Sequence, residues 1–310
     1  MGITTLFTRA IPAFQTIEGK PFPGFIDFES NETPESVFQD LPEFGLAIVG
    51  TRQPERRSLE QLERTLDALH ATRLVIVSGF ARGIDAAAHE LAARMGMKTI
   101  AILGCGIDID YPKGNRALRG KILDAGGALV SPFPRGTAPW AGNFLQRNAL
   151  IAGLSRAVWV VEAAAASGTL NTANWATRLN RDLYATSCFP GDHRFEGNEK
   201  LLSQRTPDRY PVAQSFFGPH SLASTWPGLA IHENKAPDLK RQNRSLSPIQ
   251  RWVLEIRNRY GECHLPALLG RASSEGIPRG ALLQILEVEF REGRLKQESD
   301  GRIEPGAQVK

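Results

Sequence analysis

The sequence predicts an α/β protein: a Rossmann-like, doubly wound and mostly parallel sheet, followed by a small C-terminal winged-helix-like domain. Between residues 44 and 186, short apolar runs alternate with segments of helical periodicity, which is typical of a parallel sheet covered on both faces by helices. From residue 245 onward, the pattern changes to short helices and a terminal hairpin. With 310 residues, 42% of them hydrophobic, the chain can form one large core and one small core.

The α/β body is expected to span residues 44–206. Its strands are apolar without alternation, and we place them at 44–50, 74–78, 99–103, 128–131, 157–162 and 183–186. The segments between them repeat apolar residues every three or four positions, which predicts helices at 59–70, 86–94, 115–124, 144–152 and 170–179. Ligands of such sheets bind beyond the carboxyl ends of the strands, where the strand order reverses.

The segments outside the body differ from it in composition. Residues 1–43 are expected to form an N-terminal extension, and residues 207–244 a basic linker, because five prolines and few periodic apolar positions occur there. Residues 245–310 form the predicted winged-helix-like domain, in which Ser247 and Pro248 suit the cap and first turn of a helix. A second helix, a third helix and a hairpin are expected at 265–269, 278–292 and 295–303.

The composition does not point to a membrane or a secreted protein. No apolar run reaches 18 residues, and the start of the chain has no clear cleavage site. Cys105, Cys188 and Cys263 lie far apart without CxxC spacing, which argues against a disulfide scaffold or a zinc site and fits a reducing compartment. We therefore expect a cytoplasmic protein without a metal or a cofactor.

The charge is unevenly distributed along the chain. The net charge is +4, but residues 1–43 hold two basic and seven acidic residues, so the remainder carries about +9. A basic body is the usual mark of a polyanionic partner, although taken alone it is more often explained by simple solubility.

Glycine, hydroxyl and acidic residues follow the predicted strands. Gly50, Thr51 and Arg52 end the first strand, Ser78 and Gly79 end the second, and Ser167-Gly168-Thr169 comes shortly after the fifth. Exposed amides at helix starts attract phosphate, and the fork of Arg52 suits it as well. Each loop alone reads equally well as a tight turn, but several at one sheet edge favour a polyanion site.

Signs of catalysis are scarce. The sequence contains no GxGxxG, no GxxxxGK[ST] and no GxSxG pattern, which disfavours an ordinary NAD or ATP enzyme. Asp85 and His89 are four residues apart and could pair as a base and its orienter, but a helix cap and a packed histidine explain them better. We therefore expect no catalytic residues.

Motifs along the body resemble those of the DNA processing protein A family (DprA, also called Smf). They are AIVGTRQP, SGFARGIDAAAH, AILGCGIDIDYPKGN, NFLQRNALIAGLS, VVEAAAASGTLNTA and CFPGDHRFEGNEKLL, in family order between residues 42 and 204. The resemblance implies a Rossmann-like domain that binds single-stranded DNA and hands it to the recombinase RecA during natural transformation. It also implies a cytoplasmic protein, and we expect a homodimer.

The resemblance and the loop chemistry together predict a set of DNA-binding residues. Phe144 is expected to stack on a base, with a core anchor for its helix as the alternative; Trp140, four residues earlier, could share the role. The predicted DNA-binding residues are Gly50, Thr51, Arg52, Ser78, Gly79, Arg82, Gly83, Phe144, Arg147, Asn148, Ser167, Gly168 and Thr169.

Departures from the family pattern leave other functions open. The usual Arg-Asn-Arg is Arg147-Asn148-Ala149 here, and the usual Ser-Glu is Ser131-Pro132. One alternative is a related protein that defends against foreign DNA. Another is a nucleotide-binding enzyme or sensor that uses Glu162 and the loop at 167–169. A third is a C-terminal domain that reads duplex DNA through Arg271 and Arg279, or that docks a partner.

Overall fold

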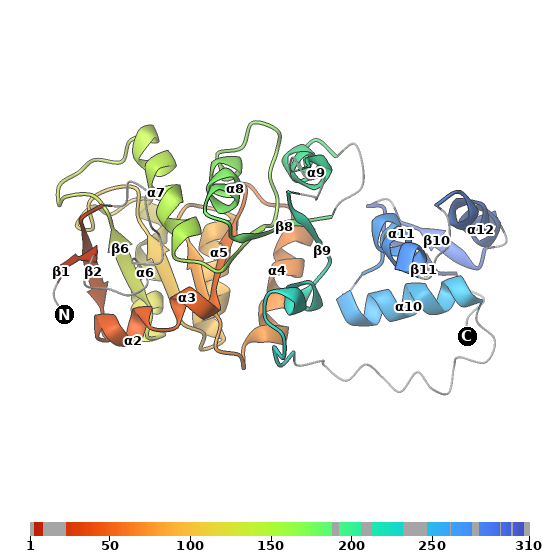
Figure 1. The fold of residues 1–310 in the computed structure, drawn as a ribbon, viewed down its shortest axis with the longest axis horizontal. Helices are drawn as coiled ribbons and strands as arrows, with labels where there is room; N and C mark the ends of the chain where they lie inside the picture. The colour runs from red at the N-terminus through yellow and green to blue at the C-terminus, as the bar shows by residue number, and fades with distance from the viewer. Residues whose placement is uncertain are drawn as a thin grey trace.

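The computed structural model describes residues 3–8, 23–187, 192–205, 212–231, 247–260, 262–274, 279–291, 293–298 and 300–306. Within these residues, nine strands form one sheet and two form a separate hairpin. The sheet and its helices make up the body of the molecule, and the hairpin belongs to a smaller C-terminal unit (Figure 1).

The centre of the sheet is parallel, as predicted. Its strands lie in the order β6-β5-β4-β3-β7-β8, with the bounds Ala128–Ser131, Thr99–Ile102, Val75–Ser78, Gly45–Val49, Ala157–Val160 and Asp182–Thr186. The chain builds outward from β3 in one direction and then returns to add β7 on its other side. The strand order therefore reverses between β3 and β7, and loops from both halves diverge there.

Strands at both edges extend the sheet beyond the predicted body. β1 (Thr4–Phe7) and β2 (Phe25–Ser30) pair antiparallel, and β2 pairs antiparallel with β6. At the other edge, β9 (Gln214–Phe216) pairs parallel with β8.

These edge strands correct the expectation that the body spans 44–206. Part of the predicted extension, 1–43, belongs to the sheet, since Ile26 and Phe28 are buried in its core. Part of the predicted linker, 207–244, does too, because Phe216 and Trp226 pack against the helices of the body. Residues 232–246 lie outside the described residues.

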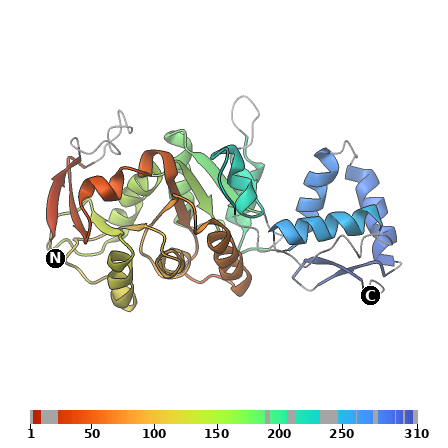
Figure 2. The same cartoon turned by 90° about the horizontal axis from the view of Figure 1, so that it is seen from below.

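Helices cover both faces of the sheet (Figure 2). One face packs on α4 (Arg56–Leu69), α5 (Ile84–Arg94) and α6 (Arg116–Asp124). The other packs on α7 (Ala141–Gly153) and α8 (Thr169–Arg178), with the short helices α2 (Pro34–Phe38), α3 (Leu41–Phe44) and α9 (Glu196–Ser203). Short 3₁₀-helical segments occupy Lys113–Asn115 and Pro219–Ser224.

Successive residues of β3 supply the two cores alternately. Leu46 and Ile48 pack toward α4 and α5, whereas Ala47 and Val49 pack toward α7 and α8. Every residue of β3 is buried, because helices cover both faces, and this explains the unbroken apolar run in the sequence.

The C-terminal unit has its own core. The helices α10 (Pro248–Tyr260), α11 (Leu265–Ser274) and α12 (Arg279–Arg291) precede the hairpin of β10 (Leu295–Gln297) and β11 (Ile303–Pro305), in the predicted order. The predicted cap of α10 is confirmed: the Gln250 amide donates to the Ser247 hydroxyl, and the Gln250 side chain accepts from the Ser247 amide. Its assignment to the winged-helix class stays a prediction.

The C-terminal unit lies beyond the β9 end of the sheet, far from β1 and β2 (Figures 1 and 2). Among the described residues, no helix is both long and apolar enough to cross a membrane.

Candidate functional site

A cleft of about 450 Å³ lies at the point where the strand order reverses. We call it the switch cleft. The loop after β3, the N-terminal halves of α7 and α8, and the start of α5 form its walls. Its lining residues are Val49, Gly50, Thr51, Arg52, Ala81, Asp85, Ala141, Phe144, Leu145, Arg147, Asn148, Ile151, Ser167, Gly168, Thr169 and Thr172.

Two glycines allow the β3 loop to pack tightly against the start of α5. A Cβ on Gly50 would lie 2.6 Å from the Ile84 side chain, and a Cβ on Gly83 would lie 2.3 Å from the Thr51 carbonyl oxygen. Gly83 also has a φ of +81°, which favours glycine. The Ile84 amide donates to the Thr51 carbonyl at 3.1 Å. The loop that carries Arg52 is therefore held by the backbone.

Arg52 projects from this loop as an exposed cation. Its guanidinium carbon lies 6.0 Å from the centre of the Phe144 ring, and among the described residues no ion pair involves Arg52. A guanidinium without a carboxylate partner stays available for an anionic ligand.

The Phe144 side chain is half-buried at the rim of the cleft. Its ring lies over Gly104, where a Cβ would come within 2.4 Å of the ring, and its centre is 5.7 Å from that of Tyr111. Gly104 and Tyr111 thus hold the Phe144 ring in place while part of the ring remains open to solvent, as a stacking platform requires.

A second arginine lies deeper in the cleft. Arg147 is 4% exposed, and its Nη1 donates to the Ile102 carbonyl oxygen. Its guanidinium and the Asp85 carboxylate approach each other around Gly79, where a Cβ would meet both. Burial lowers the pKa of Arg147 to about 10, against the attraction of Asp85, so Arg147 stays charged at neutral pH. Burial raises the pKa of Asp85, although Arg147 opposes this rise.

The hydroxyl groups of the 167–169 loop are partly used within the protein. The Thr169 amide donates to the Ser167 hydroxyl at 3.2 Å, and the Thr169 hydroxyl donates to the Gly50 carbonyl at 3.1 Å. Asn148 donates to Asn171 Oδ1 at 3.3 Å. The Thr169 hydroxyl thus joins the β3 loop to the start of α8, and Asn148 joins α7 to the same helix.

The structure brings most of the predicted site residues together. Nine of the thirteen line the switch cleft, and Ser78, Gly79, Arg82 and Gly83 do not. Ser78 is fully buried and donates to the Ile48 carbonyl at 2.6 Å, so its hydroxyl is unavailable to a ligand. Gly79 and Gly83 shape the walls as described above, and Arg82 is exposed outside the cleft.

Sequence reasoning missed Asp85 as a residue of this site. The notion of an Asp85–His89 pair finds no support, because His89 is fully buried and its Nδ1 lies 2.7 Å from the Thr99 hydroxyl. Burial lowers the pKa of His89 to about 3. His89 is therefore a neutral core residue, while Asp85 faces Arg147. Asp85 and Arg147 are far apart in the sequence, so their proximity could not be predicted from it.

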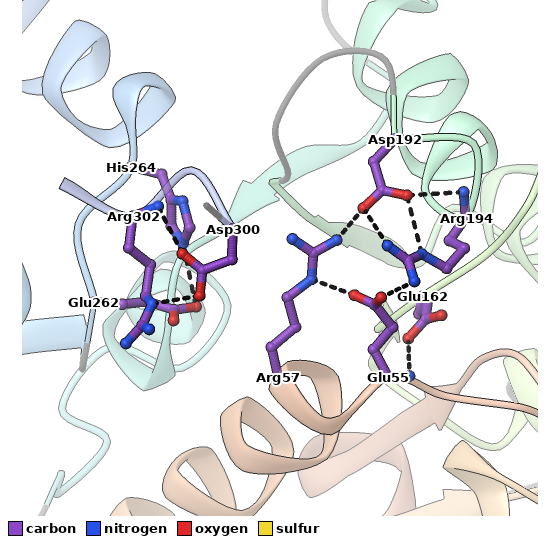
Figure 3. Close-up of polar contacts among 9 residues, drawn as sticks. All are labelled: Glu55, Arg57, Glu162, Asp192, Arg194, Glu262, His264, Asp300 and Arg302. Atoms are coloured by element: carbon purple, nitrogen blue, oxygen red, sulfur yellow. Dashed lines mark hydrogen bonds and ion pairs between the residues drawn. The ribbon is translucent and has the colours of Figure 1, made fainter. Parts of the chain in front are cut away.

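Glu162 faces away from the switch cleft. It is 1% exposed, and its Oε2 accepts the amide of Glu55, the residue before α4, at 3.0 Å (Figure 3). Burial raises the pKa of Glu162. Glu162 thus holds the backbone just before α4 and does not line the switch cleft, where the nucleotide-enzyme alternative would need it.

A second cleft, of about 480 Å³, lies between the start of α4 and the C-terminal unit. We call it the carboxylate cleft. Three arginines and four carboxylates line it: Glu55, Arg56, Arg57, Glu60, Glu262, Asp300 and Arg302. Figure 3 shows two charged groups, one from each part of the chain.

The cations of the carboxylate cleft are paired. Arg56 lies 2.7 Å from Glu60, and Arg57 lies 2.6 Å from Glu55 and also pairs with Asp192. Arg302 lies 2.7 Å from Asp300. An ion pair joins the two parts, from Arg64 to Glu262 at 3.8 Å. Among the described residues, no group of three His, Cys, Asp or Glu side chains could hold a metal ion.

Comparisons with known proteins give a consistent family. The model of a family described as DNA recombination-mediator protein A matches residues 37–211. Protein Smf of Escherichia coli is 40% identical over 171 residues, which are 55% of this chain and 46% of the relative. DNA processing protein DprA of Streptococcus pneumoniae is 41% identical over 140 residues, 45% of this chain and 49% of the relative.

Solved structures agree with these sequence matches. The X-ray structure of DprA from Streptococcus pneumoniae covers 75% of this chain and 76% of its own, with a TM-score of 0.61 and 29% identity. DprA from Helicobacter pylori covers 73% of this chain and 95% of its own, with a TM-score of 0.60 and 26% identity; it is described as having a unique single-stranded DNA binding mode.

The chain spans less than half of the length of these two curated relatives. The matched region nevertheless covers more than half of this chain and includes the whole parallel centre of the sheet and the switch cleft. The chain belongs to the DNA recombination-mediator protein A family.

Proposed function

We propose that the chain binds single-stranded DNA in the switch cleft, without catalysing a reaction, and acts in DNA processing during recombination. The single observation that carries this proposal is the pairing of an arginine free of carboxylate partners among the described residues, Arg52, with the half-open ring of Phe144 in one cleft.

The charge of the cleft suits a phosphate. Two arginines face one carboxylate, Asp85, so the lining of the cleft carries more positive than negative side chains. Arg147 is buried and tied to the Ile102 carbonyl, so it supplies a fixed positive potential. Arg52 is exposed and can contact a phosphate directly. Bound phosphates release counterions, and this drives binding at low salt.

The aromatic rim suits an unpaired base. The Phe144 ring can stack on a base of any sequence, whereas the bases of a duplex are already stacked on each other. The Helicobacter pylori relative, described as binding single-stranded DNA, covers most of this chain and supports the same ligand here.

The family to which the chain belongs suggests which proteins it binds. We propose that the chain forms a homodimer and delivers the bound strand to the recombinase RecA. We also propose that residues 247–306 form a separate winged-helix domain, which their own core of α10, α11, α12 and the hairpin supports. Arg271 of this domain lies 5.8 Å from the Trp252 ring centre and 3.9 Å from Glu255. Because its guanidinium already has neighbours within the domain, docking of a partner explains the domain at least as well as the reading of duplex DNA by Arg271 does.

Fluorescence anisotropy with labelled single-stranded and duplex oligonucleotides across a range of salt concentrations tests the proposal. We expect tighter binding of the single strand and a steep loss of affinity with salt. Equal affinity for the duplex would contradict the proposal. So would turnover of nucleotides by the same preparation that disappears in Asp85→Asn.

A further inference from the structure

Trp140 is the most exposed of the large hydrophobic side chains within the described residues, at 69%. It stands at the N-cap of α7, directly outside the switch cleft, and does not belong to any buried core cluster. An indole in this position contributes little to folding, because it gains little from burial. A solvent-exposed indole beside a candidate binding cleft therefore calls for a ligand.

Phe144, Arg147 and Ile151 form a stripe along α7 that lines the switch cleft. Exposure rises along this stripe from the floor outward: Ile151 is 1% exposed, Arg147 is 4% exposed and Phe144 is half-buried. Trp140 precedes the helix as its N-cap residue, with an extended backbone, and is followed directly by the lining residue Ala141. An exposed ring therefore stands at the end of α7 at which the stripe opens to solvent.

The indole is positioned although it is exposed. A Cβ on Gly142 would lie 2.1 Å from the Trp140 ring, so the ring packs on the bare backbone of this glycine. The Asn143 amide donates to the Trp140 carbonyl at 3.0 Å and fixes the start of the helix. A ring held in this way loses little conformational freedom when a ligand stacks on it.

We propose that Trp140 is the stacking platform for a second base, so that the site holds at least two successive nucleotides, one on Phe144 and the next on Trp140. Phe144 follows Trp140 by four residues at the start of α7, which corresponds to about 5–6 Å along the helix axis, a span that one nucleotide of an extended strand can bridge. The proposal rests on the proposed function of the cleft and adds the path by which the strand leaves it.

A nucleic acid fits this surface better than a protein partner does. The residues on either side of Trp140 in the chain, Ala138, Pro139, Ala141 and Gly142, include no large hydrophobic side chain. Ala141 lines the switch cleft, and the cleft carries positive charge. A stacking platform needs one open ring beside a phosphate track, which is what α7 and Arg52 provide.

Affinities for thymidylate oligomers of increasing length test the proposal. Trp140→Ala should weaken binding of a twelve-nucleotide strand roughly 5- to 150-fold, the range of one base–aromatic stack. It should change binding of a dinucleotide much less, because a short ligand can occupy Phe144 alone. Trp140→Phe should restore most of the loss. Phe7→Ala removes another strongly exposed aromatic ring, 62% exposed, at the far edge of the sheet, and should have no effect on any length.

The outcomes separate this proposal from the proposed function. If the unmodified protein binds single strands and Trp140→Ala binds every length as tightly, the second platform is refuted, and Trp140 is left to a protein contact. An equal loss at all lengths also refutes it. If the unmodified protein binds no single strand, the proposed function itself fails. Unchanged melting temperatures of both tryptophan variants would show that the loss is one of binding.

Discussion

The switch cleft and the carboxylate cleft are similar in volume, yet they differ in whether their arginines are paired with carboxylates. In the switch cleft, two arginines face one carboxylate, whose pKa is raised. In the carboxylate cleft, three arginines face four carboxylates and each is paired.

The comparison shows that arginine content alone does not identify a polyanion site. Arg52 and Arg56 are four residues apart and both exposed, but Arg56 pairs with Glu60 while Arg52 contacts the Phe144 ring. A phosphate at Arg56 would have to compete with a carboxylate, and a phosphate at Arg52 would not. Whether a carboxylate lies beside an arginine therefore decides whether the arginine is available to bind a phosphate.

The largest effect is expected from matched charge reversals. Arg52→Glu should weaken single-strand binding on the order of 100-fold, since like-charge contacts cost several kcal/mol. It should also make the salt slope shallower by about 1.4, at about 0.7 per charge for a single strand. Arg56→Glu should change both quantities far less. Salt titrations of the two variants check this, and similar losses in both would end the contrast between the clefts.

Substitutions of Phe144 test the switch cleft as the binding site without a change of charge. Phe144→Ala should cost about 1–3 kcal/mol of binding free energy and leave the salt slope unchanged. Phe144→Trp should restore most of the affinity, because a platform tolerates a larger ring and a packed core position does not. A large drop in melting temperature of Phe144→Ala, with normal affinity per folded molecule, would show instead that the ring is a core anchor.

The two clefts should respond to pH with opposite signs. Burial alone would raise the pKa of Glu262, but the hydrogen bond and charge of His264, with Arg64 and Arg302, lower it overall. Its stabilisation is therefore present above the ordinary glutamate pKa and is lost as pH falls through the lowered value. Asp85 has a raised pKa, so its contribution is present below the ordinary aspartate pKa and is lost as pH rises through the raised value.

Chemical denaturation of Glu262→Gln and Asp85→Asn at several pH values measures these signs. Glu262→Gln should destabilise the protein at pH 7 by about 1 kcal/mol or less, as is usual for partly exposed pairs, and this difference should shrink in acid. Asp85→Asn should be the more favourable relative to the unmodified protein at the higher pH. The same sign of pH dependence in both variants would contradict the assignment.

The smallest effect is expected from removal of the C-terminal unit. A chain that ends at residue 231 loses three of the seven residues that line the carboxylate cleft but keeps every residue of the switch cleft. Its affinity for single-stranded DNA should stay within roughly threefold of the full chain, that is within about 0.7 kcal/mol. Calorimetry should still show a cooperative transition of the body; its absence, or a large loss of affinity, would show that the two parts act together.

The parallel centre of the sheet could be predicted because each of its strands is an apolar run buried on both faces, as β3 illustrates. β2 could not be placed in the same way. Its partner β6 is about a hundred residues away in sequence, and only this distant pairing makes Ile26 and Phe28 core residues. β9 could not be predicted for a different reason, because three residues among prolines carry no periodicity.

The sequence motifs were enough to predict which loops form the switch cleft. They were not enough to predict which side chains of those loops point into it. Gly50, Arg52 and Phe144 reach one cleft because the strand order brings their loops together. The direction of the Ser78 hydroxyl, toward the Ile48 carbonyl, depends on a strand thirty residues earlier. The relation of Asp85 to Arg147 likewise depends on two helices that meet only in the fold.

Photo-crosslinking of single-stranded DNA that carries bromodeoxyuridine tests the central claim most directly, because the tryptic peptide of residues 136–147 contains both Trp140 and Phe144. We predict that this peptide carries most of the cross-linked nucleotide and that Phe144→Ala and Trp140→Ala each reduce the yield. Cross-links concentrated in residues 55–60 or in the C-terminal unit, with none in residues 136–147, would contradict binding in the switch cleft.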